Sequence, residues 1–197
     1  MKLLLASKSA ARRAMLEAAG VPFEAVEAEL DEEAGKAGLW GAGFDARGVA
    51  EELAQLKALS VRAEPGDLVL GCDQTLERAD GTLLSKPASP SEARGQLESL
   101  RGATHRLHSA AVIAESGEGI WWASETVAMS MRPFSDAYLA DYVDREWEHI
   151  RWSVGGYRIE GPGVQLFDRI EGSHFAILGL PLLPLLVYLR ERGVIRT

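Results

Sequence analysis

The sequence predicts an α/β fold, in which buried strands alternate with helices. Two short apolar runs, Lys2–Ala6 and Asp67–Cys72, have the length and composition of buried strands. The first run leads into apolar residues at helical spacing from Ser9 to Ala19, and Gly20 ends that helix. Strands that feed helices in this way are typical of α/β proteins.

The remaining elements follow from local start and stop signals. Ser89 is expected to cap a helix, with Pro90 at its first position and Glu92 completing a capping box. The other predicted elements are a strand at Val21–Glu29, a helix at Val49–Arg62, a hairpin turn at Asp80-Gly81, strands at Thr104–Ala114 and Ser124–Arg132, a helix from Ser135 to Val143, and a closing helix at Leu182–Arg192.

The segment Asp31–Arg47 is rich in glycine and charge and contains few large apolar residues. Such a composition is typical of surface loops. We expect a mobile loop that can close over a ligand.

Length and charge limit the class of protein. The chain has 197 residues, of which 47% are hydrophobic, so it can bury a core, and we expect one domain over residues 1–197. There are 29 acidic against 21 basic residues, which disfavours binding to nucleic acid. An anionic small molecule can still bind where cations converge or where carboxylates hold a metal ion.

Location is indicated by one cysteine and by the absence of membrane signals. Cys72 has no partner for an internal disulfide, and the N-terminal residues lack the order of a signal peptide. The most apolar stretch, Ala176–Leu189, contains a glycine and two prolines and is shorter than the ~20 residues that a spanning helix needs. We expect a cytoplasmic protein without a transmembrane segment.

Asp73 is the strongest single candidate for chemistry. It follows the apolar strand directly, at the end where α/β sheets place their ligands. A buried carboxylate must be paired or must hold a metal. The alternative is an Asx turn that caps the strand. Lys86, which precedes Pro87 beyond the hairpin, either returns to the same pocket or is a solvated loop lysine.

Two weaker clusters lie nearer the N-terminus. Ser7, Ser9, Arg12 and Arg13 lie where a strand turns into a helix, so they could bind one phosphate group together. The alternative is a capping serine and two solvated arginines. The acidic run Asp31–Glu33 could bind a hard cation or could simply be solvated.

Several common classes lack their signatures. No GxxxxGK[ST], GxGxxG or GxSxG string occurs, which removes support for P-loop, Rossmann and α/β-hydrolase chemistry. The four histidines and single cysteine show no zinc-ligand spacing, so structural or surface roles are expected for the histidines.

The ordered set of short motifs resembles the Maf-like nucleotide pyrophosphatases. Each string alone is unspecific, but eight occur in the family's order and cover essentially the whole chain. They are Leu5–Arg13, Leu30–Glu32, Gly71–Gln74, Ser85–Pro87, Arg101–His105, Arg132–Asp136, Tyr157–Gly161, and Gly179–Leu182.

This resemblance implies an elongated α/β fold with a mixed β-sheet flanked by helices and two lobes around a cleft. It further implies a house-cleaning enzyme that hydrolyses a nucleotide between the α- and β-phosphates, with Asp73 as general base. A homodimer is compatible with the family. The residues implied are Ser7, Arg12, Arg13, Lys57 and Lys86 as phosphate contacts, and Glu32 and Asp73 as ligands of Mg²⁺ or Mn²⁺.

Base preference is indicated by two positions. One group of the family has Thr after the catalytic Asp and Gln in the late motif and is associated with dTTP and UTP. Gln74 and Glu160 resemble the other group, which is associated with 7-methyl-GTP. A carboxylate accepts two hydrogen bonds from guanine but repels the carbonyls of uracil and thymine. Ala11 departs from the family pattern, because it removes a side chain expected near the base.

Two alternatives remain open at this point. The first is a pyrophosphatase for dTTP and UTP, in which Glu160 is a structural acid. The second is a nucleotide-binding regulator of septation without turnover, since the family has also been associated with arrested septation. Intact Asp73, Glu32 and Lys86 favour turnover.

Overall fold

The computed structural model describes residues 1–196 and has a mixed α/β fold, as predicted. The chain divides into two compact units. The first unit comprises Met1–Gln74, His108–Thr126 and the residues from Ser173 onward, and the second comprises Thr75–Leu107 and Val127–Gly172. No helix within residues 1–196 is both long and apolar enough to cross a membrane.

The elements divide between the units as follows. The first unit holds β1 (Leu3–Ala6), α1 (Ala10–Ala18), β2 (Glu24–Val26), α2 (Glu32–Gly41), α3 (Ala46–Ser60), α6 (His174–Ile177) and α7 (Leu182–Glu191). The second holds β4 (Leu83–Leu84), α4 (Pro90–Leu100), α5 (Asp136–Ile150), the 3₁₀-helices η1 (Val154–Gly156) and η2 (Pro162–Leu166), and β7 (Phe167–Glu171). Three strands contribute to both: β3 (Leu68–Glu77), β5 (Thr104–Glu115) and β6 (Glu118–Met131). The strand order of the sheet is β2-β1-β3-β5-β6-β7, and β4 pairs with β3 off this path.

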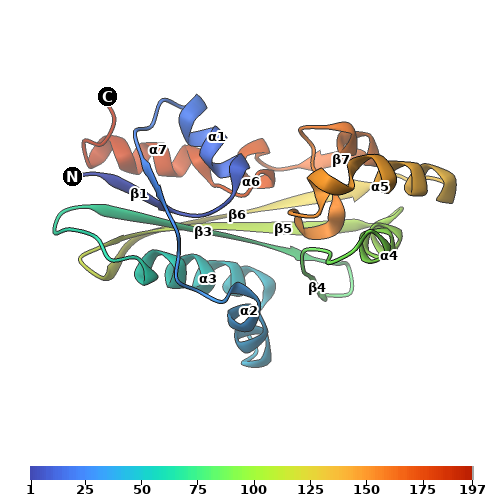
Figure 1. The fold of residues 1–197 in the computed structure, drawn as a ribbon, viewed down its shortest axis with the longest axis horizontal. Coiled ribbons are helices and arrows are strands. Elements are labelled where there is room, and N and C mark those ends of the chain that lie inside the picture. Colours follow the sequence, from blue (N-terminus) through green and yellow to red (C-terminus); the bar gives the residue numbers. More distant parts are fainter. Residues whose placement is uncertain (197) are drawn as a thin grey trace. The chain divides into compact units, whose positions relative to one another are not determined.

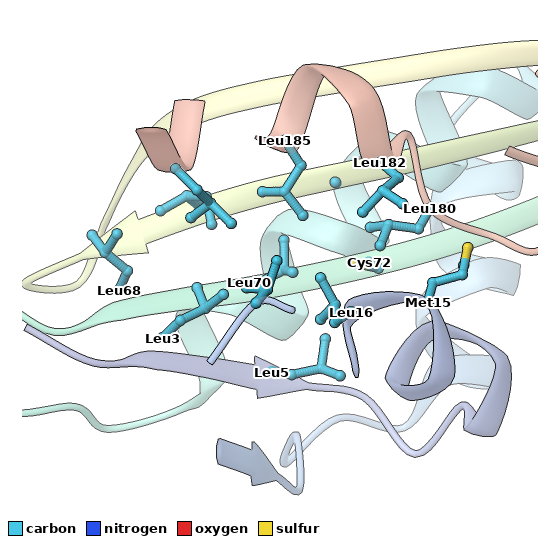
Figure 2. Packing of buried hydrophobic residues seen from close by; sticks show 14 residues of the cluster. Leu3, Leu5, Met15, Leu16, Leu68, Leu70, Cys72, Leu180, Leu182 and Leu185 are labelled. Atoms are coloured by element: carbon cyan, nitrogen blue, oxygen red, sulfur yellow. The ribbon is translucent and has the colours of Figure 1, made fainter. Parts of the chain in front are cut away.

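In the first unit the sheet is covered on both faces, by α1 and α7 on one side and by α3 on the other (Figure 1). β1 runs parallel to both β2 and β3. The α1 and α7 side contains the larger side chains, and Figure 2 shows leucines from the strands meeting Leu16 of α1 and Leu182 and Leu185 of α7. Burial of these apolar side chains stabilises the unit.

The opposite face is packed with small residues, which allows α3 to approach the sheet closely. Ala50, Ala54 and Ala58 of α3 are buried against it. At Gly71 the approach reaches the backbone itself. A Cβ atom added there would lie 2.1 Å from the carbonyl oxygen of Ala54 and 2.5 Å from the amide nitrogen of Ala58.

The second unit is built around α4 and α5 and contains a buried histidine. The Nε2 atom of His105 lies 2.7 Å from the hydroxyl of Tyr157, and its ring packs against Phe167. Burial lowers the pKa of His105 to about 4, so the ring is neutral at pH 7. This environment agrees with the structural role predicted for the histidines.

The helix caps predicted at Ser89 and Ser135 are confirmed, and Ser9 caps α1, which was the alternative interpretation of the first serines. The Oγ atoms of Ser9, Ser89 and Ser135 accept hydrogen bonds from the backbone N–H three residues later, at 3.4, 3.1 and 3.1 Å. The hairpin at Asp80-Gly81 is also present, because the N–H of Arg78 donates to the carbonyl of Thr82 at 2.9 Å. Short-range signals were therefore sufficient for these elements.

The prediction of a loop at Asp31–Arg47 is wrong. The segment contains α2, whose N-cap Asp31 accepts a hydrogen bond from the N–H of Ala34 at 3.0 Å. Glu32 and Glu33 lie in its first turn, where negative charge interacts favourably with the positive end of the helix dipole. These N-terminal signals outweigh the glycines within the helix.

Other boundaries differ from the predictions. β2 is three residues long, shorter than predicted, while β6 begins at Glu118, six residues earlier than predicted. α3 begins at Ala46, because Asp45 accepts a hydrogen bond from the N–H of Gly48 at 2.7 Å and caps it. The elements η1, η2, β7 and α6 were not predicted.

The approach of α3 to Gly71 can be tested by adding one methyl group. We expect Gly71→Ala to lower the free energy of unfolding by at least about 3 kcal/mol, because the new Cβ overlaps backbone atoms that cannot rotate away. The matched control is Gly38→Ala in α2, where nothing lies within 4 Å of the added Cβ. Gly38→Ala should be neutral or stabilising by up to about 1 kcal/mol. Urea denaturation of both variants measures the difference, and equal stabilities would contradict the packing.

Candidate active site

Asp73 lies inside β3, not after its end as predicted, because the strand continues to Glu77. The neighbouring strand β1 stops earlier, since its last residue, Ala6, pairs with Gly71. The carbonyl of Cys72 instead accepts hydrogen bonds from Arg12 Nη1 at 3.0 Å and from Lys57 Nζ at 3.5 Å. The candidate site therefore lies at the point where β3 extends beyond its partner.

Lys57 joins two carboxylates at this point. Its Nζ lies 2.6 Å from Asp73 Oδ1 and 3.0 Å from Glu32 Oε1. The Lys57 side chain is only 4% exposed and that of Asp73 10%, whereas Glu32 is 46% exposed. The structure thus brings together three of the residues predicted for catalysis, phosphate binding and metal binding.

The contact with Lys57 provides a partner for the side chain of Asp73 inside the buried strand. Burying a charge without a partner costs several kcal/mol, and the ammonium of Lys57 offsets that cost. The alternative that Asp73 caps the strand through an Asx turn is wrong, because its carboxylate points to α3. Within residues 1–196, no group donates a hydrogen bond to its second oxygen, Oδ2. That oxygen is available to a water molecule or a ligand.

Most of the hydrogen bonds that the Arg12 guanidinium donates go to backbone carbonyls. Nε donates to Gly179 at 2.7 Å, and Nη1 donates to Cys72 at 3.0 Å and to Ser7 Oγ at 3.3 Å. Nη2 donates to no residue in the described chain. Arg12 therefore ties α1, β3 and the turn after α6 together, and its phosphate-binding role stays a prediction.

The side chains of Ser7 and Arg13 are less constrained by hydrogen bonds than the side chain of Arg12. Ser7 Oγ accepts hydrogen bonds from the N–H of Ser9 and from Arg12, so its own proton remains available. Arg13 is exposed, and within residues 1–196 its side chain donates only to the carbonyl of Lys8, at 3.1 Å. Both lie beside the N-terminus of α1, where the first backbone N–H groups lack helical partners. Their phosphate-binding roles stay predictions.

Gln74 follows Asp73 and points to the opposite face of the sheet, because side chains alternate along a strand. Its Nε2 donates to Ser109 Oγ and to the carbonyls of Ala176 and Ile177, at 2.8, 2.9 and 3.0 Å. Ser109 was not predicted from the sequence. A lone serine in an apolar strand carries no signal, and its partners are main-chain atoms far away in the sequence.

The other predicted residues are distributed over both units. Ala11 lies in the first turn of α1 and is half-buried. Lys86 and Glu160 are exposed and belong to the second unit, Lys86 between β4 and α4 and Glu160 between η1 and η2. Their roles in phosphate binding and base preference stay predictions.

The carboxylates present fit a magnesium-type ion only together with a ligand. Among the described residues, no group of three or more His, Cys, Asp or Glu side chains is placed to hold a metal. Asp73 and Glu32 provide two carboxylates around Lys57. Mg²⁺ is commonly held by one or two carboxylates together with substrate phosphate oxygens and water.

Comparison with known proteins shows similarity over the full chain. The sequence profile of the Maf-like protein family matches residues 2–192. A nucleoside triphosphate pyrophosphatase from Sphingopyxis alaskensis is 49% identical, and the alignment covers 98% of each chain. Another from Caulobacter vibrioides is 50% identical over 97% of this chain and 96% of the relative. A 7-methyl-GTP pyrophosphatase from Brucella abortus is 43% identical over 99% and 98%.

The different environments of the two arginines predict different effects on stability. Arg12→Ala should lower the free energy of unfolding by about 2–4 kcal/mol, because two buried carbonyls lose a charged donor. Arg13→Ala should change it by less than about 0.5 kcal/mol, because Arg13 is exposed. Thermal and urea unfolding compare the pair. Equal effects would show that Arg12 does not tie the elements together.

Proposed function

The chain belongs to the Maf-like protein family and is a nucleoside triphosphate pyrophosphatase, and we propose that it cleaves between the α- and β-phosphates with Asp73 as general base. The observation that carries this assignment is the buried pair of Asp73 and Lys57, with Glu32 on the same ammonium. A fixed carboxylate with one free oxygen is suited to orienting water. The cations around the start of α1 are suited to phosphates.

In the proposed reaction, the oxygen of a water molecule attacks the α-phosphorus, and Asp73 Oδ2 accepts a proton from that water. The bond from that phosphorus to the bridging oxygen breaks, and pyrophosphate leaves with the electron pair. Lys57 holds Oδ1, so the carboxylate keeps one orientation. Positioning and charge supply most of the acceleration in phosphoryl transfer, so a carboxylate of ordinary basicity is sufficient.

The remaining cations act on the phosphates. The phosphate oxygens can accept hydrogen bonds from Arg13, from Ser7 Oγ and from Nη2 of Arg12. These donors stabilise the negative charge that increases on the leaving pyrophosphate as the bond breaks. Lys86 is proposed for the same role on the evidence of its motif. Because several donors share this task, loss of one should leave measurable turnover.

We propose Mg²⁺ or Mn²⁺ as cofactor, held by Asp73 and Glu32 together with phosphate oxygens of the substrate. When bound, such an ion neutralises negative charge on the phosphates. The two carboxylates are suitable hard oxygen ligands. The chemistry of these two carboxylates is the support for the proposed cofactor.

For the base, we propose 7-methyl-GTP or a similar modified guanine nucleotide. A relative of that name is 43% identical over nearly the whole chain. Gln74 has a free carbonyl oxygen, and Glu160 carries a carboxylate that can accept from the N1–H and N2–H₂ edge of guanine. The competing substrates are UTP and dTTP, whose N3–H is flanked by two carbonyl acceptors.

We also propose a cytoplasmic location, which is supported by the only cysteine. Cys72 is free and buried in β3. Burial raises the pKa of its thiol to about 11, so the thiol stays protonated and unreactive at neutral pH. A free thiol without a disulfide partner is typical of a reducing compartment.

The assigned base can be tested with one isosteric change. Asp73→Asn should lower the rate of pyrophosphate release at least about 100-fold, because an amide cannot accept the proton. The fold should persist, since the Asn oxygen can still accept from Lys57. The control Asp168→Asn changes an exposed carboxylate of β7 and should leave the rate unchanged. A coupled pyrophosphate assay with Mg²⁺ or Mn²⁺ measures the rates, and EDTA should stop wild-type release.

Three results would contradict this assignment. Undiminished turnover in Asp73→Asn would remove Asp73 from the mechanism. Release of orthophosphate would show that a different bond is cleaved. Tight nucleotide binding without any turnover in the wild-type protein would favour a regulatory role.

Base preference can be tested with 7-methyl-GTP, GTP, UTP, dTTP and CTP. We expect kcat/KM for 7-methyl-GTP to exceed that for UTP and dTTP at least about 10-fold, because the pyrimidines bring carbonyls towards Glu160. Glu160→Gln should reduce this ratio, since a neutral amide no longer repels the carbonyls. A wild-type preference for UTP or dTTP would refute the guanine proposal while leaving the pyrophosphatase activity intact.

A further inference from the structure

We propose that Ser109 is a positioning residue that fixes the side-chain amide of Gln74, so that Gln74 presents its carbonyl oxygen to the nucleobase. Ser109 lies in β5 and is fully buried, with 0% of its surface exposed. Its hydroxyl lies between Gln74 and the carbonyl of Ala176. The inference rests on the proposed function, because it assumes that the base binds beside Gln74.

The direction of the hydrogen bonds follows from the chemistry of the partners. The carbonyl of Ala176 can only accept, so at 2.6 Å it takes the hydroxyl proton of Ser109. The Ser109 oxygen can then act only as an acceptor towards Gln74, at 2.8 Å. The carbonyl of Ile177, 3.0 Å from the same atom of Gln74, is also an acceptor. The amide nitrogen of Gln74 therefore faces three acceptors.

A flipped amide would be strongly disfavoured. It would place the Gln74 oxygen against the carbonyls of Ala176 and Ile177 and leave both without that donor. Buried acceptors that lose a donor destabilise a structure, because the lost hydrogen bond is not replaced by water. With the nitrogen fixed, Oε1 is the only polar atom of the side chain left for a ligand, and no residue between 1 and 196 donates to it.

The chemical consequence concerns the edge of the base that binds. An oxygen acceptor pairs with ring N–H and exocyclic amino groups and repels carbonyl oxygens. Guanine offers two adjacent donors, N1–H and N2–H₂. Without Ser109, Gln74 keeps the carbonyls of Ala176 and Ile177 but loses its third acceptor, so its amide is held less firmly in the orientation that presents Oε1. Selectivity among bases should then decrease.

The first test measures the amide itself in the free protein. The side-chain NH₂ signal of Gln74, identified by its loss in Gln74→Ala, should exchange slowly with solvent in a ¹⁵N spectrum. In Ser109→Ala we expect exchange at least about 10-fold faster. The matched control is Ser124→Ala, which removes a serine hydroxyl that donates to Glu51 on α3. Ser124→Ala should leave the Gln74 signal unchanged.

The second test measures selectivity with the five nucleotides used above. For the nucleotide that the wild type prefers, Ser109→Ala should raise KM about 5–10-fold and change kcat less. Its KM for the least favoured nucleotides should change less, so the ratio of kcat/KM values falls. In a Gln74→Ala background, the same substitution should change KM by less than about 2-fold, because no amide remains to be positioned.

These outcomes separate the two proposals. Unchanged exchange of the Gln74 amide in Ser109→Ala would overturn the positioning role, as would an equal KM effect in the Gln74→Ala background. Unchanged selectivity would overturn it as well. If the wild-type protein released pyrophosphate from none of the nucleotides, the proposed function would fail, while the exchange measurement would still decide whether Ser109 holds Gln74.

Discussion

The close approach of α3 to β3 at Gly71 is the constraint on which the candidate site depends. Because Gly71 has no side chain, backbone atoms of Ala54 and Ala58 contact the strand directly. Lys57 lies between these two alanines in the helix, and Asp73 follows Gly71 on the same face of the strand. The helix therefore delivers its ammonium to the carboxylate at 2.6 Å. A larger residue at 71 would separate the pair and leave the carboxylate of Asp73 buried without its ammonium partner.

A second constraint is the unequal length of neighbouring strands. β1 ends opposite Gly71, so the carbonyl of Cys72 is open to side chains, and Arg12 uses it to link α1 to β3. Arg12 also holds Gly179, while Gln74 holds the carbonyls of Ala176 and Ile177. Two adjacent residues of β3 therefore point to opposite faces of the sheet. Asp73 lies beside charged side chains of α2 and α3, and Gln74 lies beside backbone carbonyls that follow β7 in the sequence. In the proposed function, the residues for catalysis and for base recognition are therefore neighbours in the sequence.

Much of the fold is encoded locally, but the site is not. Apolar runs and capping serines predicted β1, α1 and α4, because those signals lie within a few residues. The α2 helix was missed because its glycines suggested a loop, whereas its Asp31 cap was enough to start a helix. Asp73 was placed after the strand because the apolar run ends at Cys72, whereas its partner within the strand, Lys57, comes from a helix 16 residues away. The carbonyls that hold Arg12 and Gln74 have no side-chain signature at all.

The charges at the site bear on the proposed metal. Lys57 is shared by Asp73 and Glu32, so the three side chains carry one more negative than positive charge. A triphosphate placed beside them would meet repulsion, and Arg12 has most of its donors committed to carbonyls. In the partly buried surroundings of Asp73 that repulsion is weakly screened. A divalent cation between the carboxylates and the phosphates would turn this repulsion into attraction. This argument supports the proposal of Mg²⁺ or Mn²⁺, because such an ion would allow an acidic site to bind an acidic substrate.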